Sequence, residues 1–243
     1  MKRAIVIGAS SGIGRQVAQL LLQHDWHVGL AARRIEALEE LKCIAPDRIV
    51  TAKIDVTEKD SPNQLLTLIN QLGGMNLFFY AAGVGWQNPQ LEEDKEMQTV
   101  ETNAIGFTRM VGTAFRYFAN HTGGQIAVIS SVAGTRGLGP APAYSATKAM
   151  QHCYIESLEQ LSRMRNLHIN FTDIRPGFVE TPLLRGNRFP MLMSSRHVAK
   201  HIIKAIYKRR HVVVIDWRWG VVVALWRCVP HWLWRKLKLP ITP

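Results

Sequence analysis

Three residues near the middle of the chain, Ser131, Tyr144 and Lys148, have the types and spacing that acid–base chemistry requires. A helix that begins near Ala143 places Tyr144 and Lys148 four positions apart on one face, so that the ammonium group can lie close to the phenol. A phenol with a pKa of about 10 is a poor acid–base catalyst near neutral pH, and a fixed cation lowers that pKa because it favours the phenolate. We therefore expect a tyrosine that exchanges a proton with a bound molecule.

A buried strand and a turn rich in glycine and proline are expected to position these side chains. Residues 127–129 are apolar and predict the strand, and Ser130 and Ser131 follow at its carboxyl end, where open α/β sheets bind ligands. The pattern Tyr-x-x-x-Lys is weak by itself, because a surface tyrosine and lysine often share a helix face by chance. Its interpretation depends on what the rest of the chain carries.

The order and spacing of Ser131, Tyr144 and Lys148 resemble the catalytic serine, tyrosine and lysine of the short-chain dehydrogenase/reductase family. The resemblance implies hydride transfer between a nicotinamide cofactor and a carbonyl/alcohol pair. Ser131 would hydrogen-bond the carbonyl oxygen, Tyr144 would give or take its proton, and Lys148 would lower the tyrosine pKa and hold the nicotinamide ribose. Asn103, in a helix predicted over residues 92–117, resembles the family's buried asparagine, which anchors a water relay to the lysine; a structural asparagine is the alternative.

A glycine-rich loop follows the first predicted strand, residues 4–7, and a helix with apolar periodicity begins directly after the loop. Glycines permit a tight turn and a close backbone approach, and the start of a helix offers unpaired N–H groups and the positive end of its dipole to a pyrophosphate. The spacing Gly-x-x-x-Gly-x-Gly resembles the cofactor loop of the same family. The predicted contacts with the cofactor are Gly8, Ser10, Ser11, Gly12, Ile13 and Gly14.

The same loop also matches the Gly-x-Ser-x-Gly turn of serine hydrolases, between Gly8 and Gly12. A hydrolase turn normally follows several strands and not the first one, and Gly14 has no purpose in it. We favour phosphate binding and retain a hydrolase as the rival interpretation.

The second predicted strand, residues 27–31, leads to Arg33 and Arg34. At this edge NAD-selective enzymes place an acidic residue on the ribose hydroxyls, and no acidic residue is present here. Two guanidinium groups could instead hold a 2′-phosphate, which predicts NADP(H) as the cofactor. A solvated arginine pair is the alternative.

Three further predicted strands, residues 49–52, 77–80 and 168–174, end in residues that resemble cofactor-binding positions of the family. Asp55 resembles the position that holds the adenine ring, although a capping role is the alternative. After the second of these strands, the family's usual pair of asparagines is absent, so that a steadying side-chain hydrogen bond is in doubt. The remaining predicted contacts are Asp55, Val56, Ala82, Gly83, Tyr144, Lys148, Pro176, Gly177, Val179 and Thr181.

Length and composition predict one domain over residues 1–243, with 47% apolar residues and no linker-like stretch. The alternation of strands and helices predicts an α/β fold, a single doubly wound (Rossmann) domain with about seven parallel strands and helices on both faces. The predicted strands are residues 4–7, 27–31, 49–52, 77–80, 125–129, 168–174 and 212–215.

Cysteine usage and the N-terminus indicate a cytoplasmic protein. Cys43, Cys153 and Cys228 are far apart and odd in number, which argues against a disulfide framework and fits a reducing compartment. The chain enters a strand within three residues of its start, which leaves no room for a signal peptide.

Charge is unevenly distributed along the chain. Residues 196–243 hold eleven Lys/Arg and one acidic residue, so they account for +10 of the net charge of +12. The region before them is nearly balanced, which argues against nucleic-acid binding. His197 and His201 have the spacing of two metal ligands, but basic residues surround them and no carboxylate is near in sequence, so we expect no metal site.

Five of the seven tryptophans lie in a C-terminal extension, residues 217–243, where they alternate with arginine and lysine. The apolar run from Trp219 to Trp226 is too short to span a bilayer, which needs about 20 residues. Residues 217–239 could instead lie on the inner face of an anionic membrane. Packing on the sheet edge or on a partner subunit is the alternative, which we slightly favour.

The combined pattern predicts an NADP(H)-dependent oxidoreductase, of the type that acts on a small carbonyl/alcohol pair. Residues 182–193 are apolar and form the candidate substrate lid. The family resemblance suggests a homodimer or homotetramer. The competing function is an idle NADP-binding sensor or scaffold, against which the complete set of Ser131, Tyr144, Lys148 and Asn103 argues.

Overall fold

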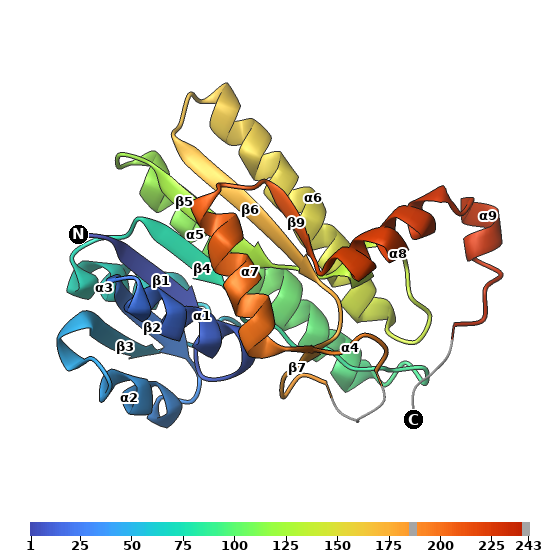
Figure 1. Ribbon diagram of the computed structural model, residues 1–243, viewed down its shortest axis with the longest axis horizontal. Coiled ribbons are helices and arrows are strands. Elements are labelled where there is room, and N and C mark those ends of the chain that lie inside the picture. The colour runs from blue at the N-terminus through green and yellow to red at the C-terminus, as the bar shows by residue number, and fades with distance from the viewer. Residues whose placement is uncertain (185–188, 240–243) are drawn as a thin grey trace.

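The computed structural model describes residues 1–184 and 189–239, and a seven-stranded parallel sheet lies at its centre (Figure 1). The strands stand in the order β3-β2-β1-β4-β5-β6-β9, and β7 pairs separately with β8. The predicted fold class is confirmed, and the ends of the seven strands differ from the predicted ends by at most two residues. The bounds are β1 Arg3–Ile7, β2 His27–Ala32, β3 Ile49–Lys53, β4 Leu77–Tyr80, β5 Gly124–Ile129, β6 Ile169–Pro176, β7 Val179–Glu180, β8 Met193–Ser194 and β9 Val212–Ile215.

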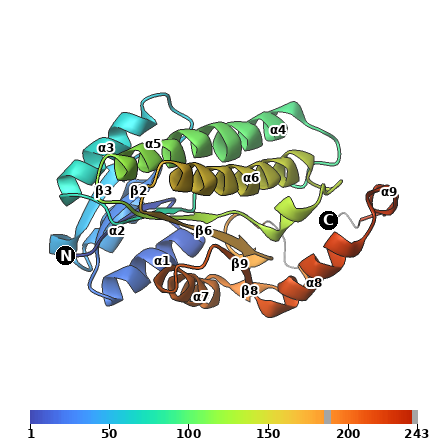
Figure 2. The same ribbon diagram turned by 90° about the horizontal axis from the view of Figure 1, so that it is seen from above.

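Helices cover both faces of the sheet: α3, α4, α5 and α6 lie on one face, and α1, α7 and α8 lie on the other (Figure 2). Short 3₁₀ turns η1 and η3 and a π-helical segment η2 complete the connections. The bounds are α1 Gly12–Gln23, α2 Glu36–Lys42, η1 Pro46–Arg48, α3 Ser61–Leu72, α4 Glu93–Val100, η2 Glu101–Gly106, α5 Phe107–Ala119, η3 Val132–Thr135, α6 Pro142–Met164, α7 Ser195–Tyr207, α8 Trp217–Cys228 and α9 His231–Trp234.

The central strands are buried on both faces. In β1, Ala4 and Val6 join the apolar core beneath α1 and α7, whereas Ile5 and Ile7 join the core beneath α3 and α5. Double burial explains why these strands consist of continuous apolar runs instead of alternating patterns. It also leaves polar side chains to gather where the strands end.

The strand order reverses direction between β1 and β4, which makes the carboxyl end of β1 a topological switch point. Ile7, the last residue of β1, is aligned with Ala31 of β2 and Tyr80 of β4. The glycine-rich loop therefore emerges beside the ends of both neighbouring strands. Ser130 and Ser131 follow β5 at the same edge of the sheet.

The helix predicted over residues 92–117 is not continuous. Its first part, α4, passes into the π-helical segment η2 before α5 begins. At Gly106, a Cβ atom would lie 2.8 Å from the Val56 carbonyl oxygen, so the widened turn packs directly on backbone. A π-helical turn is often found at functional sites, and this one contains Asn103.

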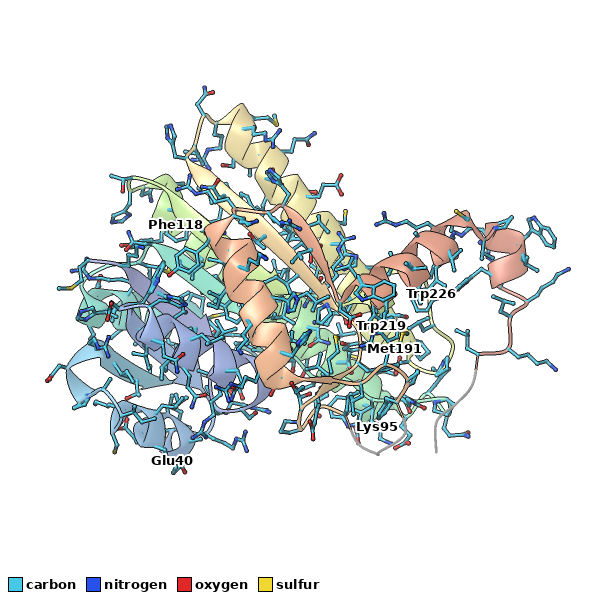
Figure 3. The ribbon with its side chains drawn as sticks, in the orientation of Figure 1. Glu40, Lys95, Phe118, Met191, Trp219 and Trp226 are labelled. Carbon is cyan, nitrogen blue, oxygen red and sulfur yellow. The ribbon has the colours of Figure 1, made fainter. Side chains whose placement is uncertain are left out.

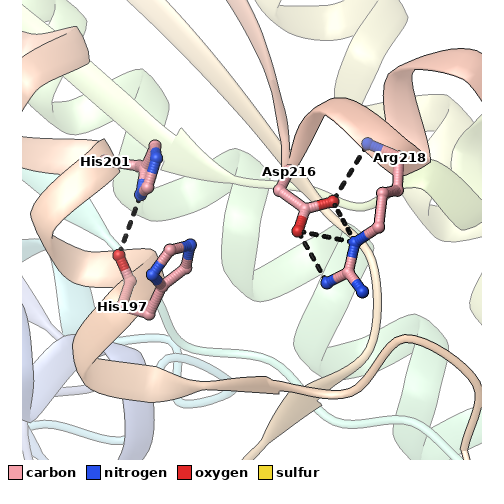
Figure 4. Close-up of polar contacts among 4 residues, drawn as sticks. All are labelled: His197, His201, Asp216 and Arg218. Atoms are coloured by element: carbon pink, nitrogen blue, oxygen red, sulfur yellow. Dashed lines mark hydrogen bonds and ion pairs between the residues drawn. The ribbon is translucent and has the colours of Figure 1, made fainter.

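The start of the C-terminal extension packs against the sheet. The Asp216 carboxylate accepts a hydrogen bond from the Arg218 N–H at 3.1 Å, which caps α8, and it also forms an ion pair with the Arg218 side chain (Figure 4). Trp219 and Val223 of α8 are buried. Figure 3 shows Trp219 at the end of α8 nearest the sheet and Trp226 further along the helix. Beyond this contact, α8 and α9 extend away from the sheet (Figures 1 and 2).

Candidate active site

Ser131 and Tyr144 meet at the carboxyl end of β5. Ser131 is the N-cap of η3, where its hydroxyl accepts a hydrogen bond from the Ala133 N–H at 3.1 Å. Tyr144 lies in the first turn of α6, whose start is favoured by Pro142 at a position that needs no N–H donor. A Cβ atom on Gly85 would lie 2.5 Å from the Tyr144 ring, so the phenol is held closely against the backbone after β4.

Lys148 lies one turn further along α6 and is 4% exposed. Its ammonium group donates hydrogen bonds to the Ile129 carbonyl oxygen at 3.2 Å and to Gln151 Oε1 at 3.0 Å. The Nζ atom lies 5.7 Å from the centroid of the Tyr144 ring. The structure therefore brings the serine, tyrosine and lysine together as the sequence predicts.

The protonation of this pair is dominated by burial. Burial raises the pKa of Tyr144, and a hydrogen bond with the Ser131 side chain acts in the opposite direction. Burial lowers the pKa of Lys148 to about 8, and the charge of Asp173 opposes that change. The raised pKa of Tyr144 differs from the lowered pKa that we expected from the nearby cation, because desolvation of the phenolate is the largest effect on this group. The phenol is thus protonated near neutral pH, the form that donates a proton.

Asn103 is fully buried in η2 and holds the chain segment that follows β4. Its Oδ1 atom accepts from the Val84 N–H at 2.9 Å, and its Nδ2 atom donates to the Val84 carbonyl at 2.7 Å and to Thr147 Oγ1 at 3.3 Å. A Cβ atom on Gly83 would lie 3.2 Å from Asn103 Oδ1. The asparagine therefore links the ends of three elements at the site, which satisfies its buried amide.

Tyr80 stands where the resemblance leads one to expect an asparagine. Its side chain is fully buried, and its ring meets Phe107 edge to face with centroids 5.4 Å apart. Within the described residues the Tyr80 hydroxyl has no hydrogen-bond partner. The steadying hydrogen bond that the sequence left in doubt is therefore not made by Tyr80, and Asn103 binds the neighbouring backbone instead.

The glycine-rich loop is a close backbone cradle at the start of α1. Gly8 has a positive φ of 85°, and a Cβ atom there would lie 2.7 Å from the Ala82 nitrogen. A Cβ atom on Gly14 would lie 2.2 Å from the Gly8 carbonyl oxygen, and Gly12 similarly approaches Thr181. Ser11 is the N-cap of α1, but its side chain makes no capping hydrogen bond. The first N–H groups of α1 are thus left to the kind of anionic group that helix starts bind.

The other predicted loop residues lie around this cradle. Ile13 packs partly buried against the apolar core. Ser10 Oγ accepts a hydrogen bond from Arg34 at 3.3 Å, which draws that guanidinium group over the loop. Arg33 is exposed beside it. Arg34 therefore reaches the cradle from the end of β2, and a role of Arg33 in cofactor binding stays a prediction.

Asp55 takes part in a turn. Its Oδ1 atom accepts from the Thr57 N–H at 3.0 Å and from the Thr57 hydroxyl at 2.8 Å, so the side chain stabilises the backbone after β3. Val56 is buried and packs against Gly106 of η2. A structural role for both residues is therefore visible, and contact with a cofactor stays a prediction.

The segment after β6 packs on the C-terminal extension. A Cβ atom on Gly177, which follows Pro176, would lie 2.1 Å from ring atoms of Trp219, so a glycine is required there by packing. Val179 is paired with Met193 across β7 and β8, and Thr181 Oγ1 donates to the Val179 carbonyl at 3.3 Å. Sequence reasoning gave Gly177 a cofactor role only, because it did not place the tryptophan.

The candidate lid, residues 182–193, is only partly visible, since residues 185–188 lie outside the described residues. Phe189 packs on Phe178 with ring centroids 4.8 Å apart, and Met191 lies against the apolar core. Phe178 in turn meets Trp219 edge to face at 5.4 Å. The end of the lid thus shares an apolar cluster with the C-terminal extension.

A second buried polar network lies beneath the site, and the sequence did not predict it. Ser130 donates to Asp173 Oδ1 and to the Ile174 carbonyl, and His152 Nε2 lies 3.1 Å from Ser130 Oγ. Arg175 pairs with Asp173 at 2.7 Å. Burial lowers the pKa of His152 to about 4, with Asp173 acting in the opposite direction. The sequence signal that could have predicted this network is the pair Gln151 and His152, which lie three and four positions after Lys148 and so share its helix face.

His197 and His201 lie on α7, where His201 Nδ1 is 3.1 Å from the His197 carbonyl oxygen (Figure 4). Their rings are 4.5 Å apart. In residues 1–184 and 189–239, no group of three or more His, Cys, Asp or Glu side chains could hold a metal ion. No helix in the same residues is both long and apolar enough to cross a membrane.

The fold and this site define a nucleotide-binding α/β oxidoreductase in which a serine, a tyrosine and a lysine meet beside a glycine-rich cradle. The chain belongs to the short-chain dehydrogenase family, whose family model matches residues 2–190. This membership replaces the hydrolase interpretation of the glycine-rich loop.

Two proteins with similar sequences are also described as oxidoreductases. An uncharacterized oxidoreductase of Myxococcus xanthus is 30% identical over 238 residues, which cover 95% of this chain and 93% of the relative. An uncharacterized oxidoreductase of Listeria monocytogenes is 33% identical over 190 residues, which cover 75% and 76% of the two chains.

Solved structures share the fold. A 3-ketoacyl-(acyl-carrier-protein) reductase of Brucella melitensis, complexed with NADH, has a TM-score of 0.80 at 19% identity and covers 88% of this chain and 96% of its own. An alcohol dehydrogenase of the archaeon Thermococcus sibiricus, complexed with 5-hydroxy-NADP, has a TM-score of 0.77 at 20% identity, with the same coverage.

Proposed function

We propose that this protein transfers a hydride between NADP(H) and a small carbonyl/alcohol pair, with Tyr144 as the proton donor and acceptor. The observation that carries the proposal is the meeting of Ser131, Tyr144 and Lys148 at the carboxyl end of β5, with only β4 between β5 and the strand β1 that leads into the glycine-rich cradle. Both parts lie at the edge of the sheet where doubly wound folds bind their ligands. The rival, an idle NADP-binding sensor or scaffold, does not need a partly buried tyrosine beside a buried lysine.

The residues present fit a nicotinamide dinucleotide. Gly8, Gly12 and Gly14 let backbone approach closely, and the uncapped start of α1 suits a pyrophosphate. Thr181 and Pro182, where the candidate lid begins, stand beside this loop, because a Cβ atom on Gly12 would lie 3.0 Å from Thr181 Cγ2 and 3.9 Å from Pro182 Cδ. When bound, the cofactor supplies or accepts the hydride.

The protein's own side chains would carry out the proton transfer. In the reducing direction, Tyr144 is already protonated, since burial raises its pKa, and it donates its proton to the carbonyl oxygen of the substrate. The Ser131 hydroxyl donates a second hydrogen bond to that oxygen. The ammonium group of Lys148 would stabilise the phenolate that remains and would hold the nicotinamide ribose. Oxidation of the alcohol reverses these transfers.

The test of this function is NADPH oxidation by the purified protein over a panel of ketones and aldehydes, with NADPH binding measured in parallel. Turnover with any member supports the oxidoreductase. Tight NADPH binding without turnover over the whole panel favours the sensor instead.

Arg34 is expected to set the preference for NADP(H). Its guanidinium group lies over the loop through Ser10, where a 2′-phosphate would stand, and arginine binds phosphate in a bidentate manner. Arg33→Ala/Arg34→Ala should lower kcat/KM for NADPH by about 10- to 100-fold and leave kcat/KM for NADH nearly unchanged. The ratio of the two kcat/KM values is the measurement, and Arg209→Ala, on an exposed turn after α7, is the matched control. A wild-type preference for NADH contradicts the assignment.

We further propose a peripheral membrane contact through residues 217–239. Trp219 and Val223 pack on the protein, as the alternative interpretation expected, but the opposite side of α8 is exposed at Trp217 (77%), Val221 (51%) and Leu225 (62%). These three residues recur every fourth position and so form one apolar stripe along the helix. The excess of basic residues after position 196 disfavours a second copy of the chain as the occupant and favours an anionic lipid surface.

Flotation with vesicles of phosphatidylglycerol and phosphatidylcholine tests this contact. The wild-type protein should float with anionic vesicles and less with vesicles of phosphatidylcholine alone, and Trp217→Ser/Val221→Ser/Leu225→Ser should stay in the lower fraction. Leu66→Ser, an exposed leucine on α3, is the control. Equal flotation of the triple variant removes the proposal. Self-association in sedimentation that the wild type shows and the triple variant loses assigns the stripe to a homodimer or homotetramer interface instead. With no lipid contact, a purely cytoplasmic location remains the proposal.

A further inference from the structure

Gln151 is a buried polar residue beside the proposed catalytic pair, and no sequence motif marks it. It lies on α6 three positions after Lys148 and is fully buried. Its Oε1 atom accepts a hydrogen bond from Lys148 Nζ at 3.0 Å, and its Nε2 atom donates to the carbonyl oxygen of Asn103 at 2.8 Å. One amide therefore bridges the lysine and the π-helical segment η2.

We propose that Gln151 is the positioning residue of Lys148: its side-chain amide holds the ammonium group against β5 and keeps it charged. The proposal rests on the function proposed above and deepens it. The family resemblance led us to expect a water relay between Asn103 and the lysine. Here a side-chain amide makes a direct connection between the same two residues.

The geometry gives the bridge two effects. An ammonium group has three N–H donors, and the Ile129 carbonyl and Gln151 Oε1 accept two of them, which leaves one for Tyr144 or a ribose hydroxyl. Because both acceptors bind the charged form, they also oppose the burial that lowers the Lys148 pKa. The amide thus fixes both the direction and the charge of the lysine.

The other charged groups around Lys148 do not replace this bridge. Asp173 on β6 attracts the ammonium group, but its carboxylate is already bound by Ser130 and by Arg175. His152, one position after Gln151 on α6, is neutral near pH 7 because burial lowers its pKa to about 4. Gln151 is therefore the side chain that accepts a hydrogen bond from the protonated lysine, beside the Ile129 backbone carbonyl.

The test titrates Lys148 in the cofactor-free protein by NMR of ¹³C-labelled lysine, with the signal assigned through Lys148→Arg. Gln151→Met keeps the approximate volume but removes the acceptor, so the Lys148 pKa should fall by about one to two pH units below its wild-type value. Gln151→Glu keeps an acceptor and adds a negative charge, so the same pKa should rise. Thermal unfolding and NADPH binding establish that each variant is folded.

Turnover gives the second readout. Activity that needs a charged lysine is lost as pH rises through the Lys148 pKa, so the alkaline limb of the kcat/KM profile should move to lower pH in Gln151→Met and to higher pH in Gln151→Glu. An unchanged Lys148 pKa in Gln151→Met, or no rise in Gln151→Glu if the first variant does not fold, overturns the inference. A wild-type protein without turnover overturns the proposed function alone, because the NMR titration needs no substrate.

Discussion

Tyr144→Phe is expected to lower kcat by about 10²- to 10⁴-fold and to leave NADPH affinity within a few-fold of the wild-type value. The substitution removes only the hydroxyl, so the ring still fills the space against Gly85. Without the phenol, no group at this position can donate a proton to the carbonyl oxygen, and Ser131 offers a far weaker acid. Steady-state kinetics with the best ketone or aldehyde and a direct NADPH titration measure the two quantities.

Tyr154→Phe provides the matched control for this variant. Tyr154 lies on the same helix, and its ring packs on Phe107 with centroids 5.8 Å apart, away from Ser131 and Lys148. Its kcat should stay close to that of the wild type. Near-normal turnover of Tyr144→Phe would contradict the role of the phenol, whereas equal losses in both variants would indicate a general disturbance of α6.

Gly14→Ala should destabilise the protein by about 3 kcal/mol and weaken NADPH binding at least tenfold. The added methyl group would lie 2.2 Å from the Gly8 carbonyl oxygen, and a backbone atom cannot move aside as a flexible side chain can. The start of α1 would have to shift relative to β1, which opens the cradle for the pyrophosphate. Urea denaturation gives the change in the free energy of unfolding, and a fluorescence titration gives the affinity.

Gly220→Ala tests the same substitution where there is room. Gly220 lies within α8, and a Cβ atom there has no neighbour within 4 Å. Because alanine has the higher helix propensity, this variant should gain up to about 1 kcal/mol and bind NADPH as the wild type does. If Gly14→Ala is as stable as the wild type, the close approach of loop and helix is not the constraint that the structure indicates.

The two predictions depend on different parts of the site. Tyr144 affects the chemical step, because it touches the reacting oxygen in the proposed mechanism. Gly14 affects the framework, because it sets the distance between the first strand and the helix that faces the phosphates. Measuring both kcat and cofactor affinity in the two variants therefore distinguishes the role of the proton donor, Tyr144, from the role of the cradle, Gly14.

The amino-acid sequence by itself determined the order of the strands along the chain and the nature of the glycine-rich loop. Continuous apolar runs predicted strands that are buried on both faces, and the loop after β1 follows from glycine spacing that is local in the chain. The pairing of Tyr144 with Lys148 was also predictable, since residues four apart on a helix share a face. Ser131 could be placed with them because it follows a predicted strand.

Only the tertiary structure decided which groups lie around that pair. Gln151 binds a carbonyl oxygen 48 residues away, and Ser130 binds Asp173 across two strands, so neither contact is visible in local spacing. The π-helical turn that contains Asn103 likewise packs, through Gly106, on the backbone of Val56 from a distant segment. The direction of the Tyr144 pKa shift is set mainly by burial, which depends on the whole fold, whereas sequence reasoning had considered only the nearby charge.

Gly177 illustrates, at a single position, the difference between what the sequence predicts and what only tertiary contacts decide. The sequence placed it just after a predicted strand, and in the structure it follows β6 directly, whereas its contact with the cofactor stays a prediction. The packing of the Trp219 ring on the Gly177 backbone could not be predicted from the sequence. Trp219 belongs to an extension that follows the last strand and folds back against this segment. Local patterns determine which elements form, whereas contacts between distant elements determine the charge, protonation and close packing of the site.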